Sequence, residues 1–452
     1  MTADVGHSYL GRTGRSHKLY RRALATMPAG ATRSLNSWPP HPLYLTHGRG
    51  SRVTDVDGNE YVDLLNNYTA LVLGHADPEV VEAVSAAAAR GTSFSFSTPQ
   101  ESELAELLCA RVPSLERVRF AGSGTEAVMF ALRLARAHTG RSRIAKMEGG
   151  FHGTHDDVAV SVRPSPGSWG PAHAPASTAD MAGLPDGCPD RVLVLPFNDV
   201  ASTTALLRRH HRDLAAVIVE PILGVGGMLP ATGEYLAALR ALCTELGIVL
   251  IFDEVITLRV SPGGAQAAYG VRPDLTVMGK VIGGGLPIGA YGGRDDLMSQ
   301  LEPQGGTDVY DARSGGPRLY QGGTFTGNPC SLAAGLVTLR RLTPRVQNEL
   351  AAKGDQLRGA LARRIADGGL AAAVTGHSSL FNIHVGVTDV TGFRDVRRVD
   401  AAAQQALFLD LLTEGFIIAP RGMGAVSTAT DRADIDAFVD AVIAALTRLA
   451  AP

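Results

Sequence analysis

Residues 248–255 read IVLIFDEV, an apolar run that ends in the acids Asp253 and Glu254. A run of this kind predicts a strand that is buried on both faces of a parallel sheet. In open α/β sheets, ligands bind at the carboxyl ends of the strands. The stretch therefore predicts an α/β protein that presents the carboxylate of Asp253 at a ligand-binding edge.

A second apolar run, DLTVMG at residues 274–279, ends at Lys280 and continues into VIGGG at residues 281–285. Because little in these segments is polar, the ammonium of Lys280 is expected to be poorly solvated. Poor solvation lowers the pKa of a lysine and makes its free amine available as a nucleophile. An amine and a carboxylate at neighbouring strand ends are what pyridoxal phosphate chemistry requires: Lys280 forms the Schiff base, and Asp253 keeps the pyridinium nitrogen protonated.

Lysine is scarce in this chain, which contains only Lys18, Lys146, Lys280 and Lys353. Lys18 lies in a polar N-terminal segment, and Lys353 begins a charged helical stretch. Lys146 ends a short predicted strand and is the one serious competitor for the Schiff base. The other interpretation of Lys280 is a surface lysine whose aliphatic stem lies along the protein. The nearby acid and the phosphate loop described below favour the catalytic interpretation.

Composition excludes several classes of function. The 452 residues suffice for two or more lobes, and the net charge of −2 comes without a dense basic stripe, which argues against nucleic acid or an anionic membrane as a partner. The four cysteines show no spacing suited to zinc and are expected to be free thiols, with no metal site. The N-terminus lacks the pattern of a signal peptide and no apolar run approaches a membrane span, so the expected location is the cytoplasm.

Helical and strand-like runs alternate between about residues 75 and 325, which predicts βαβ units and a mainly parallel central sheet flanked by helices. The expected strands are 118–120, 143–147, 191–195, 215–219 and 248–252. The expected helices cover 78–90, 101–112 and Thr125 to His138. Residues 163–190, rich in Pro, Gly, Ser and Ala, are expected to form a surface excursion near the site.

A large and a smaller α+β lobe are expected, with an N-terminal arm that packs with the smaller one. An Asp-Gly turn within Arg52 to Leu65 predicts a hairpin. After residue 330 helices dominate, and an apolar helical face near the C-terminus is attributed to core packing. The expected limits are an N-terminal arm with the hairpin over 1–70, a large cofactor-binding domain over 71–329 and a smaller α+β domain over 330–452.

A phosphate-binding loop is predicted at AGSGTEA, residues 121–127, directly after a predicted strand. Glycine lets the backbone turn tightly and present its amides, while Ser123, Thr125 and the helix N-terminus supply donors and a positive dipole. A phosphate monoester fits such a loop. Ser123 and Glu126 also have the spacing of a capping box, and capping can coexist with phosphate binding.

Two other classes of function remain open at this point. Residues 122–127 also satisfy the G-x-G-x-x-A pattern of dinucleotide binding, and Glu148 follows the next strand as a ribose-binding acid would. That pattern leaves Asp253 and Lys280 unexplained. A non-enzymatic binding or scaffold protein explains even less of the chain. An absorption spectrum separates the three, because only a lysine-bound pyridoxal phosphate is yellow.

Several short segments form a specific combination: SGTEA (123–127), FHG (151–153), VEP (219–221), FDEV (252–255), GK (279–280), GGGLP (283–287) and GTFTGNP (323–329). Together they resemble the class III (fold type I) pyridoxal phosphate aminotransferases. The nearest branch holds glutamate-1-semialdehyde 2,1-aminomutase and the β-amino acid aminotransferases. The likeness covers about Tyr20 to Leu446.

The resemblance implies a role for each matching residue around the cofactor. Ser123, Gly124 and Thr125 would hold its phosphate. Phe151 would stack on one face of the ring, and Val255 would pack against the other.

The same resemblance implies the reacting groups and the assembly. Asp253 would pair with the ring nitrogen, Lys280 would form the Schiff base, and Glu220 would stay near the ring as a support. Thr324 would reach the phosphate in the neighbouring subunit, which implies a homodimer with shared active sites.

The chain departs from the aminomutase pattern in several places. Gly122 stands where the family more often has asparagine, and Phe151 stands where it more often has tyrosine. Residues 256–260 read ITLRV after the DEV motif, which argues against a direct assignment to the tetrapyrrole enzyme.

Two arginines bear on the reaction. The resemblance places a substrate carboxylate clamp at Arg33, and a guanidinium binds carboxylate bidentately. Arg421 matches an arginine of the β-amino acid aminotransferases; the alternative for either residue is surface charge. An aminomutase keeps its intermediate bound and needs one clamp, whereas a transaminase must bind two different acids. The expected function is amino transfer between a small amino acid, such as a β-amino acid, and a 2-oxo acid; the alternative is intramolecular transfer of the aminomutase type.

Overall fold

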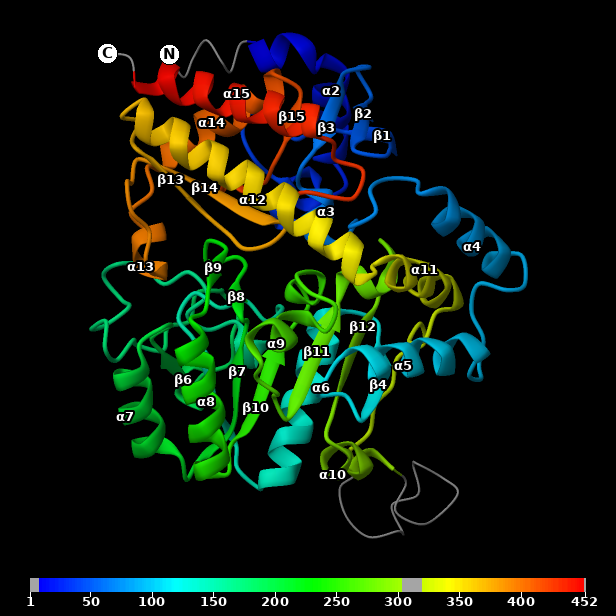
Figure 1. The fold of residues 1–452 in the computed structure, drawn as a ribbon, viewed down its shortest axis with the longest axis vertical. Coiled ribbons are helices and arrows are strands. Elements are labelled where there is room, and N and C mark those ends of the chain that lie inside the picture. The colour runs from blue at the N-terminus through cyan, green and yellow to red at the C-terminus, as the bar shows by residue number, and fades with distance from the viewer. Residues whose placement is uncertain (1–7, 303–318, 451–452) are drawn as a thin grey trace. The chain divides into compact units, whose positions relative to one another are not determined.

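The structure is a computed structural model that describes residues 8–302 and 319–450. The chain forms two compact units, one of Glu79–Asn348 and the other of Met1–Pro78 with Glu349–Pro452. Figure 1 shows their elements in chain order. The expected limits near residues 70 and 330 differ from these units, and the division into functional domains remains a prediction.

The unit of Glu79–Asn348 is built on a seven-stranded sheet in the order β4-β12-β11-β10-β7-β5-β6. Neighbouring strands from β11 to β6 pair in parallel, whereas β12 runs antiparallel to both β4 and β11. The strands are β4 (Arg117–Ala121), β5 (Arg143–Met147), β6 (Val192–Leu195), β7 (Leu214–Val219), β10 (Val249–Asp253), β11 (Leu275–Gly279) and β12 (Gly289–Gly293). The predicted α/β class with a mainly parallel sheet is confirmed.

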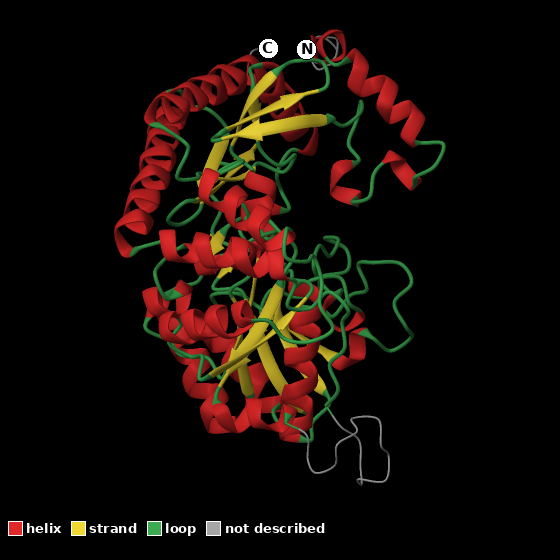
Figure 2. Cartoon of the chain, turned by 90° about the vertical axis from the view of Figure 1, so that its right-hand side faces the viewer, coloured by secondary structure: helices red, strands yellow, loops and turns green. Residues whose placement is uncertain are grey.

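Helices surround this sheet, and the strands of each unit are flanked by helices in Figure 2. The α-helices are α4 (Pro78–Ala88), α5 (Pro99–Arg111), α6 (Gly124–Thr139), α7 (Val200–His210), α8 (Gly233–Leu246), α9 (Gly264–Tyr269), α10 (Asp295–Met298) and α11 (Pro329–Arg341). Short elements are η3 (Asp156–Val158), η4 (Pro189–Arg191), η5 (Thr257–Arg259), η6 (Lys280–Gly283), η7 (Ser299–Leu301) and the pair β8 (Ile222–Leu223) and β9 (Leu229–Pro230).

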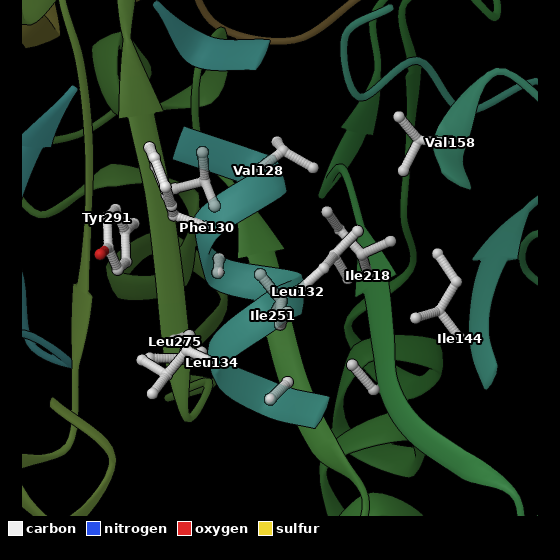
Figure 3. Close-up of a cluster of buried hydrophobic side chains, with 14 of the residues drawn as sticks. Val128, Phe130, Leu132, Leu134, Ile144, Val158, Ile218, Ile251, Leu275 and Tyr291 are labelled. Carbon is white, nitrogen blue, oxygen red and sulfur yellow. The ribbon is translucent and has the colours of Figure 1, made fainter. Parts of the chain in front are cut away.

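The core of this unit lies between α6 and one face of the sheet (Figure 3). Every residue of β7, β10 and β11 is buried, which requires cover on both faces and accounts for their continuous apolar runs. Burial of each large aliphatic side chain contributes about 1.5–3 kcal/mol. The cluster includes Val128, Phe130, Leu132 and Leu134 of α6 with Ile144, Ile218, Ile251, Leu275 and Tyr291 of the sheet.

One strand and one irregular segment of this unit differ in how well the sequence predicted them. Strand β12 reads GAYGG and was not predicted, because glycine weakens a strand and gives no alternating pattern. Residues 163–188 contain no helix or strand apart from an isolated bridge between Val160 and Ala179. This agrees with the expected break in the βα rhythm.

The other unit contains two smaller sheets, in the orders β1-β2-β3-β15 and β13-β14-β16. Their strands are β1 (Leu45–Arg49), β2 (Arg52–Asp55), β3 (Glu60–Asp63), β13 (Ala372–Thr375), β14 (Leu380–Val385), β15 (Phe416–Ile417) and β16 (Met423–Ala425). β2 and β3 form the predicted hairpin. Strand β15 pairs in parallel with β3, so residues from both ends of the chain share one sheet.

The helices of this unit are α2 (Gly14–Ala23), η1 (Pro28–Gly30), η2 (Ser34–Asn36), α3 (Asn66–Thr69), α12 (Pro344–Asp367), α13 (Phe393–Val396), α14 (Ala401–Thr413) and α15 (Arg432–Ala450). The apolar stripe of α15 is buried, and its Phe438 packs against Phe381 and Phe416 with ring centroids 5.6 and 5.5 Å away. Core packing, the expected role of this stripe, is confirmed. Within the described ranges, no helix combines the length and the apolar character that crossing a membrane requires.

Gly289 of β12 lies close to the residues that follow β4, so its substitution tests this fold. A Cβ atom added there would lie 2.0 Å from the carbonyl oxygen of Ser123, so Gly289→Ala must push backbone apart. We expect a loss of about 1–3 kcal/mol in the free energy of unfolding, measured by urea titration. Gly233→Ala is the control, because nothing lies within 4 Å of its added Cβ. Equal stability of the Gly289→Ala variant and the wild type would contradict the described packing.

Candidate active site

Asp253 and Lys280 lie at the same edge of the sheet. Asp253 is the last residue of β10, and Lys280 follows the neighbouring parallel strand β11 directly. The register places Asp253 opposite Val277, so the two strand ends are neighbours as the apolar runs predicted. Lys280 has a φ of 48°, in the left-handed region that residues other than glycine rarely adopt. Such strain persists only where surrounding structure imposes it and is frequent at functional sites.

The two buried lysines have different surroundings. Burial lowers the pKa of Lys280, and the charges of Asp253 and Glu220 oppose that shift. Lys146 is 0% exposed, and its Nζ donates to the carbonyl oxygens of Val160 at 2.7 Å and of Met147 at 3.3 Å. Lys146 lies on β5, two strands away from β10, and backbone carbonyl groups hold its amine. Lys280 is half-buried and lies beside Asp253.

Asp253 is held by a histidine to which the sequence analysis assigned no role. Its Oδ2 lies 2.9 Å from Nδ1 of His152, and its Oδ1 accepts a hydrogen bond from the amide of Val255 at 3.1 Å. Burial lowers the pKa of His152, while the bond to Asp253 opposes this. A neutral His152 therefore donates through Nδ1 and fixes the direction of the carboxylate. The signal in the sequence was the histidine of the FHG motif.

Glu220 lies beside this pair. Its Oε1 accepts a hydrogen bond from the amide of Phe151 at 2.8 Å, and its Oε2 accepts one from Gly224 at 3.0 Å. Burial first, and the charge of Asp253 second, raise the pKa of Glu220 to about 8. Glu220 thereby anchors the backbone of Phe151, the residue expected to stack on the ring.

The predicted phosphate loop begins a long helix. Ser123 Oγ accepts from the amide of Glu126 at 3.2 Å, and Glu126 Oε2 accepts from the amide of Gly122 at 2.8 Å. The capping interpretation is therefore correct, with Gly122 in place of the residue that usually closes a capping box. Since α6 has 16 residues, its N-terminal amides at Gly124 and Thr125 and its dipole form a site that favours an anion.

Close packing connects the loop to the two strand ends. A Cβ atom added at Gly124 would lie 3.2 Å from Cγ2 of Val255, and one at Gly279 would lie 3.4 Å from Cγ1 of the same residue. One at Gly153 would lie 2.6 Å from Oγ1 of Thr125. The expected phosphate and ring contacts therefore converge with Asp253 and Lys280 in one unit.

Thr324 lies in an exposed segment of the same unit. It is exposed, and the following Phe325 has 70% of its surface accessible. Its predicted contact with a neighbouring subunit stays a prediction.

Arg33 and Arg421 lie in the other unit, and the positive charge of each influences the pKa of Tyr68. Arg33 donates to Asn67 Oδ1 at 3.0 Å, and its guanidinium lies 5.9 Å from the ring centroid of Tyr68. Burial raises the pKa of Tyr68, and the charges of Arg33 and Arg421 oppose this shift. Burial lowers the pKa of Arg421, and the positive charge of Arg397 lowers it further. No role was predicted for Arg397 from the sequence.

Tyr68 is presented by a strained turn. The residues of α3 have φ values of 52°, 48°, 54° and 77°, although none is glycine. Each such residue costs on the order of 1–3 kcal/mol and persists because its surroundings hold it. Asp63 Oδ1 accepts from the amide of Asn66 at 2.9 Å, and the Asn66 side chain donates to the carbonyl oxygen of Ala425 at 2.6 Å. Strain held in this way is frequent at functional sites, and a substrate role for Arg33 and Arg421 stays a prediction.

Fold and site together define a class of protein: an α/β enzyme with a lysine and an aspartate paired at the carboxyl edge of its sheet, beside an anion-binding helix N-terminus. Residues 35–446 match the aminotransferase class-III family, and the chain belongs to that family. This membership excludes the dehydrogenase and scaffold alternatives.

Known relatives include both kinds of enzyme in this family. The chain is 40% identical to a glutamate-1-semialdehyde 2,1-aminomutase of Methanothermobacter thermautotrophicus, over 94% of this chain and 97% of the relative. It is 43% identical to an omega-transaminase of Sphaerobacter thermophilus, with a TM-score of 0.88 over 96% of this chain and 97% of that one.

Two further solved structures are similar. One is a transaminase with pyridoxal phosphate (PLP) bound, with 40% identity and a TM-score of 0.88 over 97% of this chain and 98% of the other. The second is a β-phenylalanine aminotransferase of Variovorax paradoxus, with 36% identity and a TM-score of 0.86 over 98% and 96%.

The pKa of Glu220 predicts a pH dependence of stability. Because the folded-state pKa rises from 4.5 to about 8, this carboxyl stabilises the fold fully below pH 4.5 and loses that contribution as the pH rises through 8. In the apoprotein, Glu220→Gln should therefore gain stability relative to wild type between these limits. Urea titrations across this pH range measure the difference in the free energy of unfolding. If that free energy depends on pH in the same way in both proteins, the raised pKa of the buried Glu220 is contradicted.

Proposed function

We propose that the protein is a PLP-dependent aminotransferase that moves an amino group between a small amino acid, such as a β-amino acid, and a 2-oxo acid. The observation that carries this proposal is that the charges of Arg33 and Arg421 both act on Tyr68, with the Arg33 guanidinium 5.9 Å from its ring centroid. Two separate guanidinium groups can bind carboxylates in two positions, as alternating amino and oxo acid substrates require. Similarity to an omega-transaminase and a β-phenylalanine aminotransferase supports it.

Residues on the carboxyl edge of the sheet fit this cofactor. The amides of Gly124 and Thr125 with Ser123 offer donors to a phosphate, and Phe151 and Val255 offer apolar surfaces to the two faces of a ring. When bound, PLP supplies an electron sink that stabilises a carbanion. Similarity to a transaminase with PLP bound supports the assignment.

Each reacting group has a distinct role in the proposal. Lys280 holds the cofactor covalently and, once released as a free amine, moves the proton between substrate carbon and cofactor as general base and acid. Burial that lowers the pKa of Lys280 favours the amine form that both roles require. Asp253, oriented by His152, offers its carboxylate to the ring nitrogen. Glu220 keeps Phe151 in position.

The proposal includes a homodimer in which Thr324 contributes to the phosphate site of the other subunit. The exposure of Thr324 and Phe325 supports this, because residues of a subunit interface are accessible in a single chain. A monomer that binds the cofactor at full strength would contradict it.

An aminomutase is the second candidate, and 40% identity to a glutamate-1-semialdehyde aminomutase favours it. A mutase retains its intermediate and uses no second acid. The two reactions therefore differ in whether an external 2-oxo acid takes part.

Half-reactions test the proposal. The holoenzyme mixed with an amino donor and no acceptor should lose its yellow band and release one equivalent of oxo product. Pyruvate or 2-oxoglutarate should restore the band. Arg421→Ala should slow one half-reaction at least about tenfold more than the other, because a lost carboxylate contact is worth about 1.4 kcal/mol or more.

Arg398→Ala is the control, since the side chain of Arg398 is 75% exposed and pairs only loosely with Asp395 at 3.5 Å. Isomerisation of glutamate-1-semialdehyde, with no 2-oxo acid able to restore the yellow band, would reject transamination in favour of the mutase.

A further inference from the structure

Three carboxylates share one row at the carboxyl edge of the sheet. Phe252 pairs with Val219 between β10 and β7, and Lys146 pairs with Ile218 between β5 and β7. Continuing both registers past the strand ends places Asp253 beside Glu220 and Glu220 beside Glu148. The three carboxylate residues are 4%, 4% and 5% exposed, and adjacent strands are about 4.8 Å apart.

Burial and the charge of Asp253 raise the pKa of Glu220 to about 8. Nearby positive charge keeps the other members of such a buried row from taking up protons as well. Lys280 lies at the β11 end of the row, and the charges of Asp253 and Glu220 act on it. Lys146 lies on β5 two residues before Glu148, which directly follows the strand end, and the charge of Glu148 acts on Lys146. The row therefore has a lysine at each end, and only Lys280 has a part in the proposed reaction.

Lys146 is fixed in place. It is 0% exposed, its Nζ donates to Val160 and Met147 carbonyl oxygens, and its charge interacts with Asp180, Glu220 and Glu148. Burial lowers the pKa of Lys146 to about 8, so at lower pH the fixed amine carries a positive charge.

His152 is the group on which this charge acts. Its Nδ1 bonds to Asp253, and its buried Nε2 has no hydrogen-bond partner in the described part of the chain. Lys146 and His155 face it, the charge of Lys146 opposes its protonation, and Asp253 is the acid that it contacts. A protonated His152 would form a closed ion pair with Asp253 and reduce the charge that Asp253 offers to a ring nitrogen.

We propose that Lys146 is a positioning residue: its buried ammonium balances the inner end of the carboxylate row and keeps His152 neutral, so that the charge of Asp253 remains available to the cofactor ring. The inference rests on the proposed function, because it assigns Asp253 to the ring nitrogen. It concerns a charge on β5, three strands from the strand that the reacting lysine follows.

Lys146→Met tests this in the apoenzyme, because it removes the charge and keeps an unbranched side chain of similar length. Histidines labelled with ¹³C are titrated by NMR, and the signal of His152 is assigned by its loss in His152→Asn. The midpoint of His152 should rise by at least about one pH unit in Lys146→Met. Lys353→Met is the matched control, since Lys353 Nζ also donates to two backbone carbonyls, those of Thr428 and Thr430, but in the other unit.

The holoenzyme gives a second readout. Lys146→Met should keep the yellow band, since Lys280 is intact, while kcat/KM falls about tenfold at pH 7 and its acidic limb moves to higher pH. Lys353→Met should leave both unchanged. An unshifted His152 midpoint with an unshifted acidic limb would overturn the proposal even if transamination is established.

Glu148→Gln keeps the inference testable if Lys146→Met does not fold. It removes one negative charge from the row with almost no change of shape, so the His152 midpoint should move down rather than up. A midpoint that stays in place or rises would overturn the proposal. The half-reaction experiment, which tests the function itself, is independent of these titrations.

Discussion

Parallel pairing of β10 with β11 is the constraint on which the site depends. It joins two apolar strands whose next residues are chemically active, and it leaves Asp253 and Lys280 at one edge. Neither side chain alone would indicate an active site. Burial of a single acid or a single lysine costs free energy. Together, with Glu220 and His152 in contact range, they form a set of groups whose charges depend on one another.

The rest of the unit holds this edge in shape. The core between α6 and the sheet fixes the helix whose N-terminus faces the site. Glycines let backbone approach where no side chain fits, most clearly where Gly289 of β12 meets the carbonyl of Ser123. The N-terminal amides of α6 and the strand ends are therefore parts of one packed arrangement, and a change in β12 should shift the predicted phosphate loop.

The parts of the molecule that could be predicted are those in which a pattern of neighbouring residues in the sequence reports the structure. The apolar runs before Asp253 and Lys280 and the S-x-x-E spacing at Ser123 lie within a few residues of the groups they concern, and the structure contains those strands and that cap. The bond between His152 and Asp253 joins residues 101 apart in the chain, and no local pattern reports it. The same holds for Arg33 and Arg421 around Tyr68, whose left-handed turn has no glycine to signal it. Strand β12 was missed because its glycines carry no periodicity.

The central claim is that Lys280, and not Lys146, is the residue that binds PLP covalently. Reduction of the yellow holoenzyme with borohydride, followed by proteolysis and mass spectrometry of the peptides, measures this directly. The account predicts the cofactor mass on the peptide that contains Lys280 and none on the peptide that contains Lys146. The cofactor on Lys146, or on neither lysine, would contradict it.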